Sequence, residues 1–158
     1  MLGAMKGSQG LNALCFVDVV MNRRSVRALV DTGASHNFVK QEVADEIGLK
    51  RKDCGVRVKA VNSKAKAAAG VASEVSVQLV RWTGKIDFTI MPLDDLDMIL
   101  GQDFLRRRQA VLLPFANKMV IFRGEKPTMV KTIEGKMNGQ EKFVSALRVK
   151  KVARRSKT

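Results

Sequence analysis

The amino-acid sequence predicts an all-β domain, a closed barrel of about seven short strands with one or two short helices. Three observations support this fold class. Runs of apolar and β-branched residues recur at short intervals, with polar turns between them. Helical periodicity is confined to brief segments. Apolar residues make up 46% of the chain and charged residues 28%, which is the balance of a globular domain rather than a disordered one.

The first part of the chain is expected to pair two strands before a short helix. Residues 13–20 (ALCFVDVV) and 25–31 (SVRALVD) are typical of strands, and the polar residues between them indicate the turn of a hairpin. Apolar residues from 38 to 47 follow a helical period. Asn37 is the expected N-cap of this helix, and Gly48 is expected to end it.

The later elements are mostly strands. Four are expected at residues 56–61, 70–82, 85–93 and 97–101. Residues 102–108 favour one or two helical turns with Asp103 near the N-cap, and residues 110–122 favour a hairpin around Asn117. After Gly124 the periodicity weakens, and residues 141–155 are compatible with a helix.

Basic residues are concentrated towards the C-terminus. The 29 Lys and Arg residues exceed the 15 Asp and Glu residues, for a net charge of +14. Residues 124–158 hold 10 of the basic residues and 3 Glu, a net charge of +7. We therefore expect a flexible N-terminus at 1–11, a folded domain at 12–123 and a basic C-terminal tail or linker at 124–158. Such a tail can bind nucleic acid through counterion release, or it can be a solvated end without a partner.

The composition argues against several classes of protein. No run of about 18 apolar residues occurs, so no membrane contact is expected, and the N-terminus lacks the pattern of a secretory signal. Cys15 and Cys54 have neither metal nor disulfide spacing, which indicates reduced thiols in the cytoplasm or the nucleus. Asp94, Asp95 and Asp97 are interpreted as a solvated turn rather than a cation site. We expect no metal and no other cofactor.

A carboxylate directly follows an apolar strand in ALVDTGASHNF, residues 28–38. An ionised Asp31 at the end of a buried strand is costly unless it gains partners or a raised pKa. Gly33 tolerates backbone geometry that other residues resist. A second apolar element that ends in glycine, Ile99-Leu100-Gly101, lies 70 residues further on. The pattern indicates a functional carboxylate, and a plain strand-ending turn is the alternative for the tripeptide alone.

Two segments carry a resemblance to a known family. FVDVVMNRRSVRALVDTGASHNFV and FTIMPLDDLDMILGQDFL are similar to retropepsin-type aspartic proteases. They most resemble the protease segment of plant gypsy-class long-terminal-repeat retrotransposon polyproteins. The resemblance covers residues 12–123. It implies a retropepsin-like closed β-barrel protomer with a flap hairpin, which forms a homodimer in which the two Asp31 side chains meet at a two-fold axis.

The resemblance also implies roles for individual residues. Asp31, Thr32 and Gly33 would form the catalytic loop, with Thr32 hydrogen-bonding across the axis and Gly33 letting the backbone pass close to the substrate. Substrate contacts are implied for the following part of the loop and for the flap tip, namely Ala34, Ser35, Val61, Asn62, Ser63 and Lys64. Ile99, Leu100 and Gly101 would pack beneath the loop and hold it rigid. The sequence departs from the family pattern in a flap tip without glycine and in Gln102, where retroviral relatives often have Arg.

Carboxylate chemistry agrees with this interpretation. Two carboxylates in contact cannot both ionise, so they share a proton; one can then activate water while the other protonates the substrate. A single Asp-Thr-Gly therefore requires a symmetric homodimer. We expect an aspartic endopeptidase that hydrolyses polypeptides, including its own retrotransposon polyprotein. One alternative is a catalytically inactive retropepsin-fold module for dimerisation or peptide binding. Another is nucleic-acid binding through the tail at 124–158.

Overall fold

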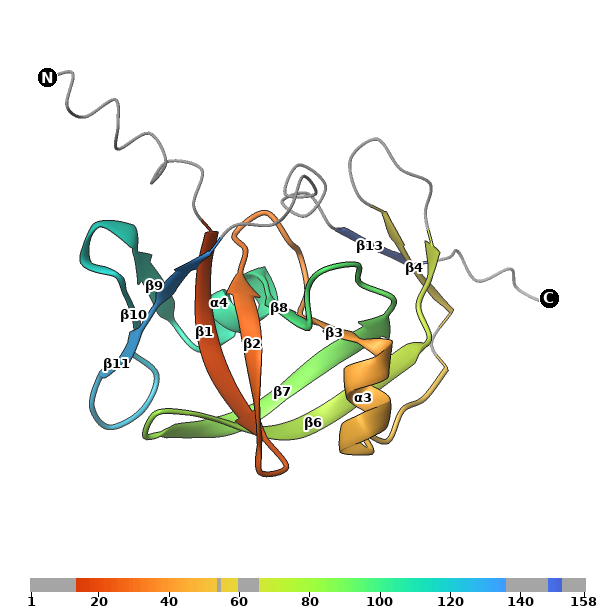
Figure 1. Ribbon diagram of the computed structural model, residues 1–158, viewed down its shortest axis with the longest axis horizontal. Helices are drawn as coiled ribbons and strands as arrows, with labels where there is room; N and C mark the ends of the chain where they lie inside the picture. Colours follow the sequence, from red (N-terminus) through yellow and green to blue (C-terminus); the bar gives the residue numbers. More distant parts are fainter. Residues whose placement is uncertain (1–13, 54, 60–65, 136–147, 152–158) are drawn as a thin grey trace, which may run out of the picture.

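The computed structural model describes residues 14–53, 55–59, 66–135 and 148–151, which form a mostly β protein (Figure 1). Its strands are β1 (Leu14–Met21), β2 (Arg24–Val30), β3 (Phe38–Lys40), β4 (Val56–Lys59), β5 (Lys66–Ala67), β6 (Gly70–Leu79), β7 (Trp82–Met91), β8 (Met98–Leu100), β9 (Ala110–Leu113), β10 (Lys118–Ile121), β11 (Thr128–Lys131), β12 (Ile133–Gly135) and β13 (Arg148–Lys151). Two short helices, α3 (Gln41–Ile47) and α4 (Gln102–Arg107), and the 3-10 turn η1 (Pro114–Ala116) complete this part of the chain. None of the helices in the described ranges is long and apolar enough to cross a membrane.

Six strands close into a barrel. The largest sheet has the order β12-β1-β2-β8-β3-β7-β6, and an additional pairing joins β1 to β6 where Val20 lies opposite Gln78. This pairing makes a ring of β1, β2, β8, β3, β7 and β6, and a closed ring leaves no free strand edge within it. The expectation of an all-β closed barrel with one or two short helices is confirmed.

Two hairpins on the barrel turn through residues with positive φ. Between β1 and β2, Asn22 and Arg23 have φ of 50° and 69°, and the strands pair from Met21–Arg24 to Phe16–Leu29. This is the geometry of a tight two-residue turn, and the hairpin was expected. The expected strand through 70–82 is wrong at its end, because the chain turns at Val80, which has φ of 56°, before Trp82 begins β7. The turn itself, Leu79 to Trp82, contains no glycine, proline or asparagine that would indicate it.

The helix expected from Asn37 begins later than predicted. Phe38–Lys40 forms β3, which pairs in parallel with β7 and antiparallel with β8, and helix α3 begins at Gln41. Phe38 and Val39 are fully buried, so burial between two strands outweighs the helical period of the segment. Gly48 ends α3 as expected, with φ of 78° and its N–H bonded to the carbonyl of Ala44.

The region after α4 forms more strands than expected. β9 and β10 make the expected hairpin around Asn117, which has φ of 52°. Residues 124–135, assigned to the tail from the sequence, contribute β11 beside β10 and β12 beside β1. The expected helix at 141–155 is wrong for residues 148–151, which form β13 and pair with β4. β12 and β13 pair with strands distant in sequence, whereas β11 pairs with β10, the strand just before it.

The apolar side chains form two clusters, one on each side of the sheet that carries Asp31. Alternate residues of β2 divide between them, since side chains along a strand point to opposite faces. Ala28 and Val30 pack in the barrel interior, where Trp82 and Phe104 meet edge to face at 5.9 Å. Leu29 belongs to the second cluster, whose buried members are Phe16, Leu29, Ala34, Phe38, Val58, Met91, Leu96 and Ile99. The second cluster lies directly against the loop that follows Asp31, because Ala34 is part of both.

Candidate active site

Asp31 lies where β2 leaves the sheet. β2 runs parallel to β8, with Val30 opposite Leu100, and the Asp31 N–H donates to the Leu100 carbonyl at 3.0 Å. β8 itself lies between β2 and β3. The backbone of Asp31 is therefore held by a strand from the second half of the chain, and its side chain is only 8% exposed.

The two oxygens of the Asp31 carboxyl group have different surroundings. Oδ1 accepts a hydrogen bond from the Gly33 N–H at 2.8 Å. Oδ2 is buried and has no hydrogen-bond partner among the described residues. Burial raises the pKa of the Asp31 carboxyl group above its ordinary value, and the Gly33 N–H opposes this by stabilising the anion. One oxygen is thus fixed, while the other remains available to a proton, a water molecule or a second carboxyl group.

The loop after Asp31 is anchored to the start of α4. The Ala34 N–H donates to the Asp31 carbonyl at 3.2 Å, which closes the turn. The carbonyl of Ala34 accepts from the Gln102 N–H at 2.8 Å, and that of Ser35 from the Asp103 N–H at 3.2 Å. Ala34 is fully buried, whereas Thr32 is exposed. The loop therefore presents Thr32 outward on a backbone that is bonded to α4.

Gly101 permits this close approach of α4 to the loop. A Cβ atom at Gly101 would lie 2.3 Å from the His36 carbonyl oxygen and 2.7 Å from the Ala34 carbonyl oxygen, both of them backbone atoms. Neither atom can move without displacing the loop, so glycine is required on steric grounds. Ile99 and Leu100 are fully buried in β8 beside β2, and Gly101 follows them against the backbone of the Asp31 loop.

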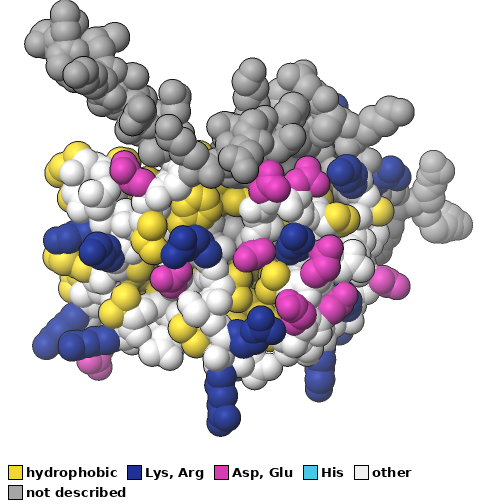
Figure 2. All heavy atoms as spheres, in the orientation of Figure 1, with side chains coloured by type: hydrophobic (Ala, Val, Ile, Leu, Met, Phe, Trp, Pro, Cys, Tyr) yellow, Lys and Arg dark blue, Asp and Glu magenta, His cyan; other side chains and the backbone are white. Residues whose placement is uncertain are grey.

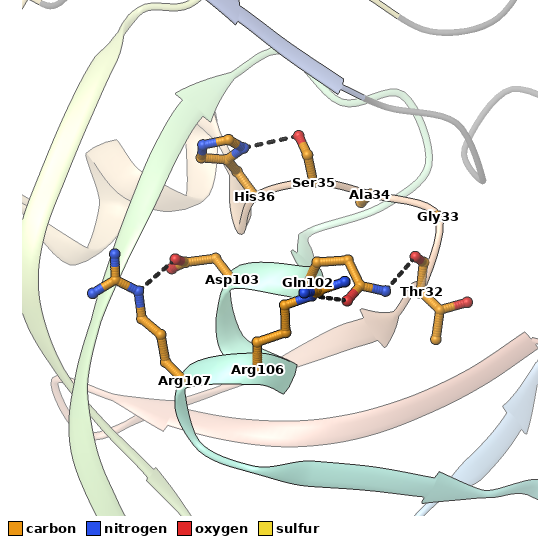
Figure 3. Close-up of a pocket in the computed structure, with 9 residues that line it drawn as sticks. All are labelled: Thr32, Gly33, Ala34, Ser35, His36, Gln102, Asp103, Arg106 and Arg107. Atoms are coloured by element: carbon orange, nitrogen blue, oxygen red, sulfur yellow. Dashed lines mark hydrogen bonds and ion pairs between the residues drawn. The ribbon is translucent and has the colours of Figure 1, made fainter.

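A side-chain relay from α4 also reaches the loop. The Gln102 Nε2 donates to the Thr32 carbonyl at 2.7 Å, and the Arg106 Nε donates to Gln102 Oε1 at 3.1 Å (Figure 3). Gln102 thus holds Thr32, the residue after Asp31, by an uncharged hydrogen bond. Retroviral relatives often have Arg at this position. The sequence singled out Gln102 only as a departure and gave no signal of this bond.

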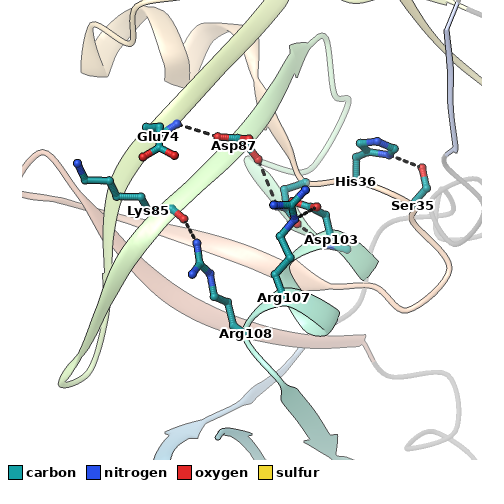
Figure 4. Close-up of polar contacts among 10 residues, drawn as sticks. Ser35, His36, Glu74, Lys85, Asp87, Asp103, Arg107 and Arg108 are labelled. Atoms are coloured by element: carbon teal, nitrogen blue, oxygen red, sulfur yellow. Dashed lines mark hydrogen bonds and ion pairs between the residues drawn. The ribbon is translucent and has the colours of Figure 1, made fainter. Parts of the chain in front are cut away.

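Asn37 connects the loop to α4 and β7. Its side chain is 1% exposed. The Oδ1 accepts from the Gly101 N–H at 3.0 Å, and the Nδ2 donates to Asp103 Oδ2 at 3.1 Å and to the Asp87 carbonyl at 3.2 Å. Asp103 in turn pairs with Arg107 at 2.7 Å (Figure 4). Asn37 was expected to be a helix N-cap; this is wrong, since Lys40 is the N-cap. Asn37 instead bonds the start of α4, at Gly101 and Asp103, and β7, at Asp87.

A cavity of about 440 Å³ opens beside the loop (Figure 3). It is lined by Thr32, Gly33, Ala34, Ser35, His36, Gln102, Asp103, Arg106 and Arg107. The cavity thus includes four residues of the expected site but not Asp31, whose carboxyl group does not line it. His36 is exposed and shares a hydrogen bond of 2.8 Å between its Nδ1 and Ser35 Oγ.

The expected site residues are brought together in part. Asp31 to Ser35 and Ile99 to Gly101 are adjacent, although their separation in sequence is 70 residues. The expected flap tip, Val61 to Lys64, lies outside the described residues. The strands on either side of it, β4 and β5, pair antiparallel with Val58 opposite Lys66, as in a hairpin. No group of three metal-binding side chains occurs in the part of the chain that is described.

Comparison with known proteins gives a consistent result. The family described as "gag-polyprotein putative aspartyl protease" matches residues 17–107, more than half of the chain. The chain is 31% identical over 115 residues to DNA damage-inducible protein 1 of Neurospora crassa, covering 71% of this chain and 26% of that protein. It is 28% identical over 134 residues to the UBA domain-containing protein Mud1 of Schizosaccharomyces pombe, covering 79% of this chain and 40% of that protein. The chain thus spans less than half the length of either relative.

The fold has a counterpart among solved structures. The retroviral protease-like domain of Ddi1 from Leishmania major aligns with a TM-score of 0.63 and 22% identity, covering 76% of this chain and 94% of that one. A plant retrotransposon origin, expected from the sequence, is not shown by these comparisons. The matched family and the barrel around Asp31 nevertheless agree: the chain belongs to the gag-polyprotein aspartyl protease family, and its fold is retropepsin-like.

Proposed function

We propose that this chain is an aspartic endopeptidase that acts as a homodimer, with Asp31 of each protomer forming the catalytic pair. The observation that carries the proposal is the Asp31 carboxyl group itself. It is buried, one oxygen is held by Gly33, and the other has no hydrogen-bond partner among the described residues. A buried polar atom without a partner is costly, so a site of this kind is expected to gain a partner in the working enzyme.

A second copy of the chain supplies the most economical partner. Peptide hydrolysis by this chemistry needs two carboxyl groups, and the chain has only one Asp-Thr-Gly. A two-fold axis beside the exposed Thr32 would place two identical loops against each other in an isologous interface. Burial raises the pKa of Asp31, and a second carboxyl group at contact would favour a shared proton further.

The catalytic roles follow from that shared proton. The ionised Asp31 takes a proton from a water molecule as the water attacks the peptide carbonyl carbon. The protonated Asp31 of the other protomer donates its proton to the carbonyl oxygen, and the leaving amine is protonated as the bond breaks. Aspartic proteases are the standard case of such a dyad. The pair titrates as a unit, so its two apparent pKa values belong to neither residue alone.

The substrate is proposed to be an extended polypeptide. The backbone beyond Asp31, at Gly33 to Ser35, would contact its main chain on one side, and the β4–β5 hairpin would close over it. For the biological setting we propose a polyprotein that includes this domain, as the family description suggests. The curated relatives are longer than this chain, so a domain within a larger protein of the Ddi1 type is the competing setting.

Isosteric substitution of the acid tests the proposal. Asp31→Asn should abolish peptide cleavage while the protein remains folded, because Asn retains the Oδ1 acceptor for Gly33 but cannot hold or release the proton. Asp18→Asn is the matched control, since Asp18 is a half-exposed carboxylate of β1, 3.5 Å from Arg27. Cleavage of a peptide library by the Asp31→Asn variant at the wild-type rate would refute the assignment.

Mixing the two proteins tests the dimer separately. In an equimolar mixture with free exchange of protomers, inactive Asp31→Asn chains should lower the activity per wild-type chain by about half, because heterodimers lack one acid. Activity per wild-type chain that is unchanged by excess Asp31→Asn protein would show that one protomer is sufficient, and the homodimer would have to be abandoned.

A further inference from the structure

The outer face of the sheet formed by β9, β10 and β11 carries mostly apolar side chains. Side chains alternate between the two faces of a strand, and on the inner face Leu112, Met119 and Val130 lie side by side against the barrel core. The described residues of the opposite, outer face are Val111, Leu113, Lys118, Val120, Phe122, Met129 and Lys131. Five of these seven are apolar, two are lysines and none is acidic. Figure 2 shows hydrophobic side chains next to basic ones on the side of the molecule where Figure 1 places these strands.

Val120, at the centre of the outer face, is shielded by its neighbours on that face. It lies directly opposite Val111 on one side and Met129 on the other. Val120 is 7% exposed and belongs to neither apolar cluster, whereas Val111 is 44% and Met129 61% exposed. Phe122, which follows β10, is 50% exposed and extends the apolar area. Contiguous exposed apolar side chains indicate a binding site, whereas isolated ones are ordinary features of a protein surface.

Positive charge marks one end of the outer face. Lys118 lies directly opposite Lys131, and this pair is about 7 Å along the strands from Val120. Neither lysine forms an ion pair with another residue in the described part of the chain. Like charges directly opposite each other act against strand pairing, and a carboxylate from a partner would relieve the repulsion. A second copy of the same face would instead add two more lysines and no acidic residue.

The dimensions of the outer face match a single α-helix. Three strands at a spacing of about 4.8 Å make the face about 10 Å wide, which is about the diameter of one helix. Two residues of a strand span about 7 Å, and one helical turn rises about 5.4 Å. A helix lying along β10 can therefore place apolar side chains over Phe122 and Val120 and, one turn further, an acidic side chain over Lys118. Because Val120 is recessed between two more exposed side chains, the face fits a rod-shaped partner better than a planar lipid surface.

We propose that the outer face of β9, β10 and β11 binds an amphipathic helix of a partner protein. The apolar stripe of this helix covers Val120 and its two neighbours, and its acidic residues pair with Lys118 and Lys131. Burial of apolar surface provides the binding free energy. The two lysines determine the direction in which the helix lies, because only one end of the face is charged. The proposal does not depend on whether the chain cleaves peptides.

Binding of a designed helix to the full chain tests the proposal. The probe is a fluorescently labelled peptide with a stripe of leucines over two helical turns and glutamates on the same stripe in the next turn. Its binding to the Asp31→Asn protein, which should leave the probe intact, is followed by anisotropy. A peptide with the same residues in scrambled order controls for general attraction to a protein of net charge +14. The probe should bind at least ten-fold more tightly than the scrambled peptide, and equal binding of the two would overturn the proposal.

Removal of apolar side chains from the outer face locates the site. Val111→Thr with Met129→Gln should weaken binding of the probe at least ten-fold, because both side chains are exposed and contribute contact area without belonging to the core. The matched control is Val20→Thr with Val80→Gln, since these side chains are also exposed, at 37% and 56%, and lie on β1 and in the β6–β7 turn. The control should alter binding by less than three-fold. Equal losses in the two variants would refute the outer face as the site.

Charge reversal tests the pairing with the two lysines. Lys118→Glu with Lys131→Glu should weaken binding of the probe at least ten-fold, and it should strengthen binding of a second peptide in which lysine replaces each glutamate. Lys50→Glu with Lys85→Glu makes the same change in net charge at exposed lysines of other segments and should alter either affinity by less than three-fold. An equal loss in both variants, or no gain with the lysine peptide, would show that Lys118 and Lys131 do not pair with the helix and would overturn the proposal.

Two further measurements separate the other possible occupants of the face. Vesicles of phosphatidylcholine and phosphatidylserine should bind the wild-type protein and the Val111→Thr/Met129→Gln variant equally. Sedimentation velocity should give the two proteins the same dissociation constant for self-association. Loss of vesicle binding in the variant would assign the face to a lipid surface, and loss of self-association would assign it to a second copy of the chain; either result would overturn the proposal.

Discussion

Removal of the Asn37 side chain should destabilise the protein more than any ordinary polar substitution. Asn37→Ala deletes three hydrogen bonds, to Gly101, Asp103 and Asp87. At about 1 kcal/mol each these are worth about 3 kcal/mol, and leaving the buried Gly101 N–H without an acceptor costs about 1–2 kcal/mol more. We therefore expect a loss of about 4–5 kcal/mol in the free energy of unfolding, a large part of the stability of a typical domain.

Urea unfolding measures this loss directly. Trp82 is the only tryptophan and is 8% exposed, so its fluorescence reports the opening of the barrel. With an m-value of about 2 kcal/mol per molar urea, the midpoint should fall by about 2 M. Gln78→Ala is the control, because it removes one exposed amide bonded to the Val80 carbonyl at 2.8 Å. Both variants are compared at one protein concentration, since dimerisation would add to stability. A loss in Asn37→Ala no greater than in Gln78→Ala would refute this account of the site.

Two further predictions concern the loop that begins at Asp31. Burial raises the pKa of Asp31 above 3.8 in the folded protomer. The ionised carboxylate therefore lowers the free energy of unfolding at neutral pH. Below the unfolded-state pKa the group is protonated in both states, so this cost disappears. Asp31→Asn should therefore increase the free energy of unfolding at pH 7, and a series of urea titrations should show this gain shrinking as the pH falls through 4; a gain independent of pH would contradict the assignment of the raised pKa. Gln102→Leu removes the 2.7 Å hydrogen bond to the carbonyl of the exposed Thr32, so the free energy of unfolding should fall by about 1 kcal/mol or less. In the peptide-cleavage assay, kcat should fall while KM changes little. A proportional rise in KM at constant kcat in steady-state assays would show that Gln102 contacts substrate instead of positioning the loop.

Local sequence signals predicted the elements that depend on local chemistry. The β1–β2 turn, the end of α3 and the β9–β10 hairpin each use a residue that tolerates positive φ, namely Asn22, Gly48 and Asn117. The alternation of apolar residues along the strands and the spacing of the turns were sufficient to predict a closed barrel. The adjacency of the Asp31 loop and Ile99–Gly101 came from the family resemblance, since no local rule connects residues so far apart.

Several of the elements that were missed depend on partners distant in sequence, among them β3, β12 and β13. Phe38 and Val39 fit a helical period, and only the neighbouring strands β7 and β8 determine that they form β3. The turn at Val80 contains none of the usual turn residues. β11, β12 and β13 are short strands, each ordered by a single neighbouring strand of the described structure.

The missed site residues have the same physical origin. Asn37 was interpreted as an N-cap because asparagine is common at that position. The same side-chain amide can also bond buried backbone groups, and the sequence does not distinguish the two roles. Gln102 was noted only for the Arg that it replaces. The bonds of both residues join the first and second halves of the chain, and a single sequence carries no information on such contacts.

The placement of β8 between β2 and β3 has a consequence for the formation of the proposed homodimer. β8 runs parallel to one neighbour and antiparallel to the other, so the acid-bearing turn is built from the interior of a single protomer. The conformation of this turn is therefore formed before a second subunit binds. In the proposed homodimer, docking of two subunits would then add a second acid to a surface that is already formed, and the delay before peptide cleavage begins should depend on subunit concentration and not on a slow rearrangement inside each subunit.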